Sequence, residues 1–344
     1  MESLFLQTAP PLDPAWLAFE EEFGLNKPRP ELAIAEHQVT YAAECRSLNA
    51  KMLAPGARDH HLSLNVTKTD FTVPSTLASL SVDEANCYQI PVIRYQHASA
   101  SSAEDEQPDV TVLYIHGGGG LYVGEADSEE LSCLRILKAT SVPTTKNVND
   151  INKSHLIKDV YSLTYPLMPT YSAQDGLSDC LSQEVPPADN SPPSSPNTPL
   201  PLHGTIHGVL LRCPVTSDAF SGLDPYVPLR FRHLHTSAWH PSFWNLLLGQ
   251  MKRTVPRDGL ERMPLETEEE ILKRLPRTWI QLCTNDSLYS DGVCYAKALE
   301  EVGVEVRVDV VRGWPHTFWL KAPGFGRALE AEEDMVRGFV WLLG

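Results

Sequence analysis

The sequence predicts an α/β protein with an open, mostly parallel sheet and a helical cap. After an antiparallel hairpin, short apolar segments alternate with segments of helical periodicity, a pattern typical of parallel sheets covered by helices. Residues 219–275 interrupt the alternation with aromatic residues, histidines and short helical patterns, as a cap inserted over an active site would. We therefore divide the chain into an N-terminal helical segment, residues 1–60, and an α/β domain, residues 61–344.

Each element has its own local signal. Asp13 before Pro14 is typical of a helix start, and Gly24 of its end. A second helix is expected at about 31–52, and together these two helices either form a lid or cover a sheet edge. The predicted strands are 66–73, 88–95, 110–115, 160–165, 208–213, 278–283 and 304–310. Further helices are predicted from about Asp127, with Glu130 as its capping-box partner, and at 173–183, 292–302 and 327–342.

Composition excludes several classes of partner. A net charge of −16 and a pI near 5.2 argue against nucleic acid and anionic membranes. Seven cysteines without a C-x-x-C pair indicate neither a zinc site nor a disulfide framework, so we expect reduced, buried thiols and no metal. We predict no secretory leader, and the sequence contains no apolar run of about 18 residues. We expect a cytoplasmic protein.

The strand at 110–115 is apolar throughout, as expected of a strand buried on both faces. A glycine-rich segment follows it. It reads His116-Gly117-Gly118-Gly119-Gly120. Acyl transfer needs preorganised backbone N–H groups around an oxyanion, and glycine permits close approach and positive φ. The alternative is a phosphate loop, but no G-x-x-x-x-G-K-S/T and no convincing dinucleotide fingerprint occur. The segment therefore predicts an oxyanion loop, and we expect no cofactor.

Two further residues follow predicted strands at their carboxyl ends, where ligands bind in such sheets. Asp286 comes after the strand at 278–283, and His316 after the strand at 304–310. Taken alone, Asp286 and Asp291 are typical of helix capping, and a histidine among aromatic residues is usually a packed surface residue. An Asp followed by a His about thirty residues later, each after a strand, favours the acid and base of a catalytic triad.

These segments resemble the hormone-sensitive-lipase family of α/β-hydrolases over most of the chain. His116 to Gly119 resemble its oxyanion motif, Tyr165 to Pro169 its tyrosine-and-two-prolines segment, and His316-Thr317-Phe318 its histidine motif. Asp286 with Leu288 is similar to its acid motif. The resemblance implies a cofactor-free serine esterase or lipase of the α/β-hydrolase fold. The N-terminal segment also resembles hydrolases of fungal secondary metabolism.

The family's nucleophile elbow, G-x-S-x-G, occurs nowhere in the chain. The nearest string, Gly176 to Cys180, lacks the last glycine, and its Ser178 lies in a predicted helix. The proline-rich residues 184–203 occupy the place of the elbow and the central fifth strand, so we expect both to be missing. Residues 141–159 form a polar insert. One segment too many and one missing suggest a mis-spliced gene product.

The sequence thus predicts a carboxylic ester hydrolase lineage acting on a small-molecule ester. With the serine absent, this chain is expected to be impaired. The alternative is a non-catalytic, small-ligand-binding pseudo-hydrolase, since the fold also serves binding. A homodimer stays open.

Overall fold

The computed structural model describes residues 1–27, 32–75, 88–98, 110–118, 121–139, 157–182, 205–219, 226–236 and 255–344. The chain forms two compact units. Unit 1 holds Met1–Ala33 and Ile206–Gly344, and unit 2 holds Ile34–Thr205. Most of the predicted insert and all of the proline-rich residues 184–203 lie outside the described residues. No helix in the described ranges combines the length and the apolar character needed to cross a membrane.

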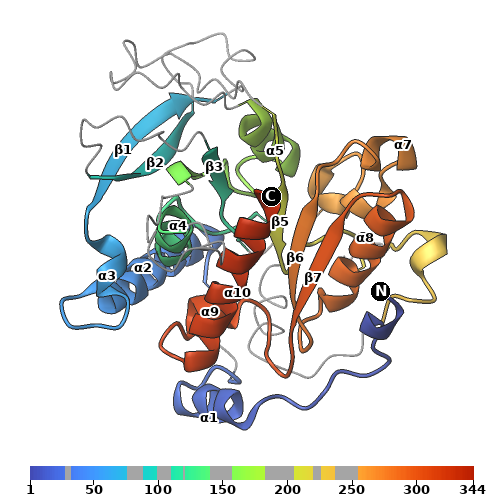
Figure 1. The fold of residues 1–344 in the computed structure, drawn as a ribbon, viewed down its shortest axis with the longest axis horizontal. Helices are drawn as coiled ribbons and strands as arrows, with labels where there is room; N and C mark the ends of the chain where they lie inside the picture. The colour runs from blue at the N-terminus through green and yellow to red at the C-terminus, as the bar shows by residue number, and fades with distance from the viewer. Residues whose placement is uncertain are drawn as a thin grey trace, which may run out of the picture. The chain divides into compact units, whose positions relative to one another are not determined.

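Unit 2 is built on a four-stranded sheet in the order β1-β2-β4-β3 (Figure 1). The strands are β1 (Val66–Pro74), β2 (Gln89–His97), β3 (Val110–Ile115) and β4 (Ile157–Leu163). β1, β2 and β4 pair antiparallel, whereas β3 and β4 pair parallel. The predicted hairpin followed by parallel pairing is therefore present. β4 begins at Ile157, so residues 157–159 belong to a strand and not to the insert, because Ile157 and Asp159 pair with β3.

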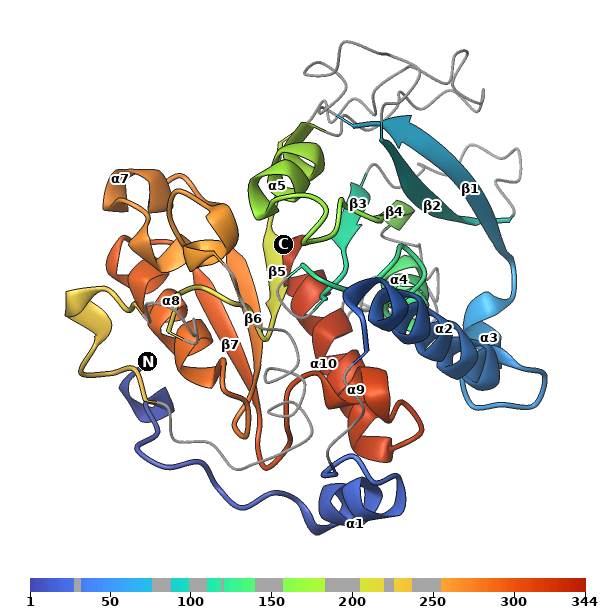
Figure 2. The ribbon, with the colours of Figure 1, turned by 180° about the vertical axis from the view of Figure 1, so that it is seen from behind.

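In the described part of unit 2, the helices beside this sheet are α2 (Ile34–Leu53), α3 (His60–Ser63), α4 (Glu130–Leu137) and α5 (Ala173–Ser182). α4 packs on β4 and β2, and α3 contacts both α2 and α4 (Figure 2). The helix predicted from Asp127 begins three residues later, and no side chain caps it. The reason is that the carboxylate of Glu129, the residue before the helix, binds other groups, namely the N–H of Gly117 and the hydroxyl of Tyr114.

Unit 1 is built on three parallel strands in the order β5-β6-β7, namely β5 (Val209–Arg212), β6 (Thr278–Cys283) and β7 (Val306–Val311). Two long helices, α8 (Tyr289–Glu301) and α10 (Gly326–Leu342), cover opposite faces. Gly292 of α8 lies against Leu282, and Gly338 of α10 lies against Trp279. Leu282 and Trp279 are three residues apart on β6, and side chains alternate between the faces of a strand.

Shorter elements complete unit 1. They are η1 (Glu2–Leu4), α1 (Pro14–Glu22), η4 (Leu229–Phe231), η5 (Pro256–Gly259), η6 (Pro264–Glu266), α7 (Glu269–Leu272) and α9 (Phe318–Lys321). Asp13 caps α1 as predicted, accepting the N–H of Ala15 at 2.8 Å. Trp16 of α1 is fully buried and packs edge-on against Trp314 and Phe318. The two predicted N-terminal helices thus fall in different units, α1 in unit 1 and α2 in unit 2.

The strands β3 and β5 lie at the edges of their sheets. The sequence predicts β3 as a strand buried on both faces, and this is wrong: its residues are half-buried, and Ile115 is 50% exposed. β5 is half-buried throughout, whereas every residue of β6 is buried. The physical reason is that β3 and β5 each pair with one neighbour in the described part of the chain. Apolar composition typical of interior strands thus occurs at two sheet edges.

Candidate active site

The loops that follow β6 and β7 carry Asp286 and His316. Parallel pairing sets Cys283 at the end of β6 beside Val311 at the end of β7. The backbone ties the loops together further on, since the N–H of Thr284 donates to Val311 O at 3.0 Å and that of Asn285 to Trp314 O at 3.2 Å. The register of β6 and β7 therefore fixes where the acidic and the imidazole side chains meet.

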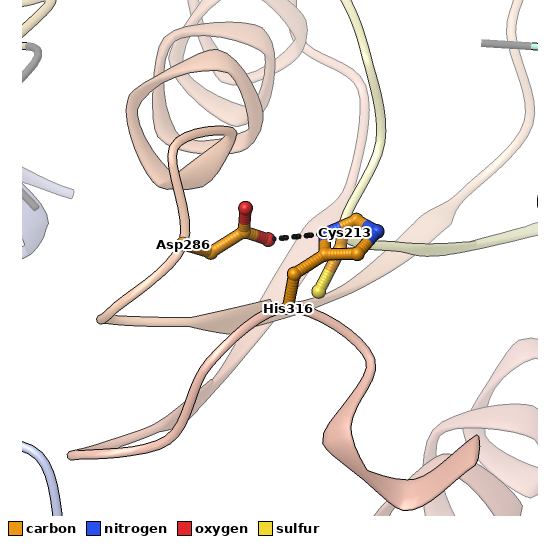
Figure 3. A group of neighbouring side chains, drawn as sticks. All are labelled: Cys213, Asp286 and His316. Carbon is orange, nitrogen blue, oxygen red and sulfur yellow. Dashed lines mark hydrogen bonds and ion pairs between the residues drawn. The ribbon is translucent and has the colours of Figure 1, made fainter. Parts of the chain in front are cut away.

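His316 and Asp286 form a buried hydrogen-bonded pair (Figure 3). Nδ1 of His316 lies 2.7 Å from Oδ2 of Asp286, and the two side chains are 11% and 1% exposed. The other carboxylate oxygen, Oδ1, accepts the N–H of Leu288 at 2.9 Å. Leu288 is the N-cap residue of α8, so Asp286 binds both the helix start and the histidine. One oxygen of Asp286 thus contacts the start of α8 and the other contacts the histidine.

Asp291, the other candidate cap, has a different place. It lies inside α8 and is fully buried. Its carboxylate accepts the N–H groups of Thr216 and Ser217 and lies 2.7 Å from Nε2 of His235. Asp291 thus anchors the segment after β5 to α8.

The charge of Asp286 governs the titration of His316. Burial lowers the pKa of His316, but the nearby carboxylate of Asp286, its hydrogen bond and the contact with Cys213 raise that pKa to about 10. At neutral pH the imidazole therefore carries a proton and a positive charge. A charged imidazolium donates protons readily, whereas it accepts one only after losing its own.

A third side chain, a thiol, belongs to this cluster, and sequence reasoning missed it. Cys213 follows β5 directly, and its N–H donates to Gln281 O of β6 at 2.8 Å. The polar side-chain atoms of Cys213, Asp286 and His316 all lie within 4.8 Å of one another (Figure 3). The available signal was a cysteine before a proline at a strand's carboxyl end, next to the strand that precedes Asp286.

The local conditions of Cys213 differ from those of an ordinary core thiol. Burial raises the pKa of Cys213, but hydrogen bonds with Cys283 and His316 and the positive charge of His316 lower it to about 7. Its backbone has φ = 46°, in the left-handed region. A non-glycine residue there costs about 1–3 kcal/mol, and such strain gathers at functional sites. The six cysteines that the structure describes are buried, as predicted, and none of them is in a disulfide.

The same three side chains are of types that bind zinc. However, the carboxylate and Nδ1 of His316 are at hydrogen-bonding distance from each other. A cation bound through both atoms would replace the proton that they share. The arrangement therefore suits proton transfer.

The predicted oxyanion loop lies in unit 2, where His116, Gly117 and Gly118 are described and Gly119 lies outside the described residues. A Cβ on Gly118 would come within 1.9 Å of Val123 O, so close approach requires glycine there. Neither Gly117 nor Gly118 has the positive φ that the sequence suggested, because the loop closes through hydrogen bonds from Tyr122 and Val123 to Gly118 O.

Tyr165 and Glu129 hold the start of this loop in place. Burial lowers the pKa of His116 to about 4, so its imidazole is neutral, and its ring stacks on Tyr165 at 4.5 Å between centroids. The Tyr165 hydroxyl donates to His116 O at 3.1 Å. The Gly117 N–H donates to Glu129 Oε1 at 2.8 Å and is thereby engaged. The sequence did not single out Glu129, which comes twelve residues after Gly117 in the chain.

Ser178 lies within α5, as the sequence predicts, and Gln174 on the same helix donates to its hydroxyl at 3.3 Å. A nucleophile elbow would place a serine on a strained turn after a strand. Ser178 therefore lacks the local geometry of a hydrolase nucleophile.

Comparison with known proteins agrees with this architecture. Residues 191–320 match the family described as alpha/beta hydrolase fold. A hyperthermophilic esterase from the archaeon Pyrobaculum calidifontis superposes with a TM-score of 0.64 at 16% identity, covering 97% of this chain and 99% of that one. The chain has the α/β-hydrolase fold. The matched residues include Cys213, Asp286 and His316 but not the loop at His116.

Two relatives by sequence are similar to parts of this chain. AB hydrolase superfamily protein B1A11.02 of Schizosaccharomyces pombe is 41% identical over 71 residues, 21% of this chain and 21% of that protein. FAD-linked oxidoreductase pytB of Aspergillus terreus is 24% identical over 297 residues, 79% of this chain and 33% of that protein. The chain thus spans a fifth to a third of the length of these relatives.

Proposed function

We propose that this chain is an α/β-hydrolase of the hormone-sensitive-lipase type that acts on small carboxylic esters. The observation that carries the proposal is the 2.7 Å contact between Asp286 and His316, at the carboxyl ends of β6 and β7. The hydrolase family match and the likeness to an archaeal esterase support the same chemistry. A fold alone does not determine an activity, so the proposal depends on this pair.

Each of the two residues has a role in ester hydrolysis. Because Nδ1 of His316 is engaged with Asp286, proton transfer to and from the reacting atoms falls to Nε2. His316 acts as acid and base, and Asp286 orients the ring and stabilises its positive charge. We retain the prediction that N–H groups of the His116 to Gly119 segment, those of Gly118 and Gly119, stabilise the oxyanion.

We further propose that hydrolysis is slower than in a serine hydrolase. The sequence contains no G-x-S-x-G, and Ser178 lies within a helix. The half-buried apolar edges of β3 and β5 support the inference that a central strand is missing. The cytoplasmic location and a substrate from fungal secondary metabolism stay predictions. A flavin is not part of the proposal, since the named oxidoreductase is matched over a third of its length.

The test is hydrolysis of p-nitrophenyl acetate by the full chain. We expect a rate above that of buffer which is lost in His316→Gln and strongly reduced in Asp286→Asn. His61→Gln is the matched control, because His61 is an exposed histidine of α3 in unit 2. Equal rates for the unmodified chain and the His316→Gln variant would contradict the proposal.

A second candidate is a small-ligand-binding protein without catalysis. The missing serine elbow favours it, whereas the preserved Asp286–His316 pair does not, because binding alone does not need a proton relay. Saturable binding of a short-chain ester by the folded chain, with no product formed, would favour the second candidate.

A further inference from the structure

We infer that the Cys213 thiol is the nucleophile of this site and forms a thioester with the acyl group of the substrate. The inference rests on the proposed ester chemistry and adds the group that the sequence leaves missing. It starts from the juxtaposition of a thiol, an imidazole and a carboxylate within 4.8 Å.

The sheet of unit 1 explains why these side chains meet. Three successive parallel strands each contribute one group just past the carboxyl end, Cys213 after β5, Asp286 after β6 and His316 after β7. The pairing of Arg212 with Gln281, and of Cys283 with Val311, aligns the three strand ends. Ligands of parallel α/β sheets bind at such ends. The cluster is therefore positioned by the regular part of the fold.

The backbone at Cys213 has a feature expected of a nucleophile. Hydrolase nucleophiles sit on a strained turn directly after a strand, which projects the reactive atom from the sheet. Cys213 is the first residue after β5 and has φ = 46°. Pro214 follows it. The turn thus resembles a nucleophile elbow in its position and strain. It follows β5, however, whereas the serine elbow of the hydrolase family follows the central strand that this chain is expected to lack.

The electrostatics favour a thiol over a hydroxyl. With the pKa of Cys213 at about 7 and that of His316 at about 10, about half of the Cys213 thiols are ionised at pH 7, each beside an imidazolium. Two other buried thiols, Cys180 and Cys294, have pKa values raised to about 12 by burial. A serine needs a neutral imidazole to accept its proton, whereas a thiolate attacks without a base.

The reaction balances without a cofactor. The thiolate sulfur of Cys213 attacks the ester carbonyl carbon, a C–S bond forms and the C–O bond breaks. The alkoxide leaves with the proton of His316. A water molecule then attacks the thioester, and neutral His316 takes one of its protons. Collapse releases the carboxylic acid and restores the thiolate and the imidazolium.

The first experiment is intact-protein mass spectrometry after exposure to p-nitrophenyl acetate at pH 7, with peptide mapping. We expect one acetyl group on Cys213, and none at that position in Cys213→Ser. Cys294→Ala is the matched control and should still acquire the group, since burial raises the pKa of Cys294 to about 12 and keeps it a neutral thiol at pH 7. Thermal unfolding of each variant verifies that it is folded. Acetylation elsewhere, or none on a folded chain, overturns the inference.

The second experiment is the pH dependence of alkylation by iodoacetamide. We expect Cys213 to react with a midpoint near pH 7, and His316→Gln to move this midpoint upward. A purely packed thiol would stay unreactive from pH 6 to 8, and that result overturns the inference. If hydrolysis depends on His316 but is unchanged in Cys213→Ser, the proposed function stands and this inference fails. If Cys213 is acetylated without turnover, this inference stands and the hydrolysis proposal fails.

Discussion

Oδ2 of Asp286 lies 2.7 Å from Nδ1 of His316, while Oδ1 of the same carboxylate is held by the N–H of Leu288 at 2.9 Å. The helix start therefore limits the rotation of the carboxylate, and the carboxylate in turn limits the rotation of the imidazole. Orientation of this kind contributes to proton transfer by lowering the cost of reaching the reactive geometry.

Asp286→Asn should separate charge from geometry. The amide keeps a hydrogen-bonding group near His316 but removes the negative charge, so the pKa of His316 should fall from about 10 toward its ordinary value. We expect kcat/KM for p-nitrophenyl acetate to fall by about 10²–10⁴-fold. Steady-state kinetics and NMR titration of the imidazole measure the two effects. An unchanged His316 titration would show that the carboxylate does not set its charge.

The stability of the chain should depend on pH through the same pair. His316 has a raised pKa in the folded state, so its contribution is complete below about pH 6.5, the ordinary pKa, and is lost as pH rises through about 10. Cys213 has a lowered pKa, so its contribution is present above about pH 8.5 and is lost as pH falls through about 7. The two slopes oppose each other between about pH 7 and 8.5.

The slope from Cys213 is absent at pH 8.5–10. There we expect the free energy of unfolding by urea to fall with rising pH in both chains, because burial also raises the pKa values of Cys180 and Cys294 to about 12. We expect it to fall less steeply in His316→Gln. Parallel slopes for the two chains would mean that His316 is not stabilised in its charged form.

The strands of this fold were predictable where an apolar run has clear limits. β3 (Val110–Ile115) and β6 (Thr278–Cys283) begin and end where the sequence predicts. Such runs are bounded by polar residues, glycine or proline, so local composition is sufficient. The burial of β3 was not predictable in the same way, because it depends on which strand lies beside it. Sequence periodicity describes a strand but not its neighbours.

The site shows the same division. Asp286 and His316 were predictable because each follows a strand and together they match a known order. Cys213 was missed, since its contacts with Cys283 and His316, which lower its pKa, depend on residues far along the chain that only the register of β5, β6 and β7 brings close. Glu129 was missed for a similar reason: its carboxylate binds Gly117 across a turn that no periodicity reveals.

Glu332→Gln should destabilise the chain. Glu332 lies 2.7 Å from Arg212, and these side chains are 6% and 8% exposed. Removing one charge leaves the guanidinium buried beside Trp319 without its counter-charge, which costs about 3–5 kcal/mol. Urea unfolding measures the loss. Glu330→Gln is the control, because Glu330 is 64% exposed in its pair with Arg327 and surface pairs contribute about 0–1 kcal/mol. Equal losses would refute the buried pair.

Gly118→Ala should destabilise unit 2, whereas Gly117→Ala should not. A Cβ at Gly118 would lie 1.9 Å from Val123 O and 3.1 Å from the Tyr165 hydroxyl. The backbone of the loop must then shift, which costs about 1–3 kcal/mol. At Gly117 the nearest atom, Glu129 Oε1, is 3.5 Å away, an ordinary contact, so alanine should change stability by less than about 1 kcal/mol.

Thermal unfolding of the two variants compares neighbouring glycines in the same loop. A lower Tm for Gly118→Ala alone would show that close approach to Val123 is what requires glycine. If both variants melt alike, the loop has room for a side chain, and the repeated glycines then require another reason. That reason would be access of a reacting oxygen to the backbone N–H groups. In that case we expect both variants to hydrolyse the ester more slowly at an unchanged Tm.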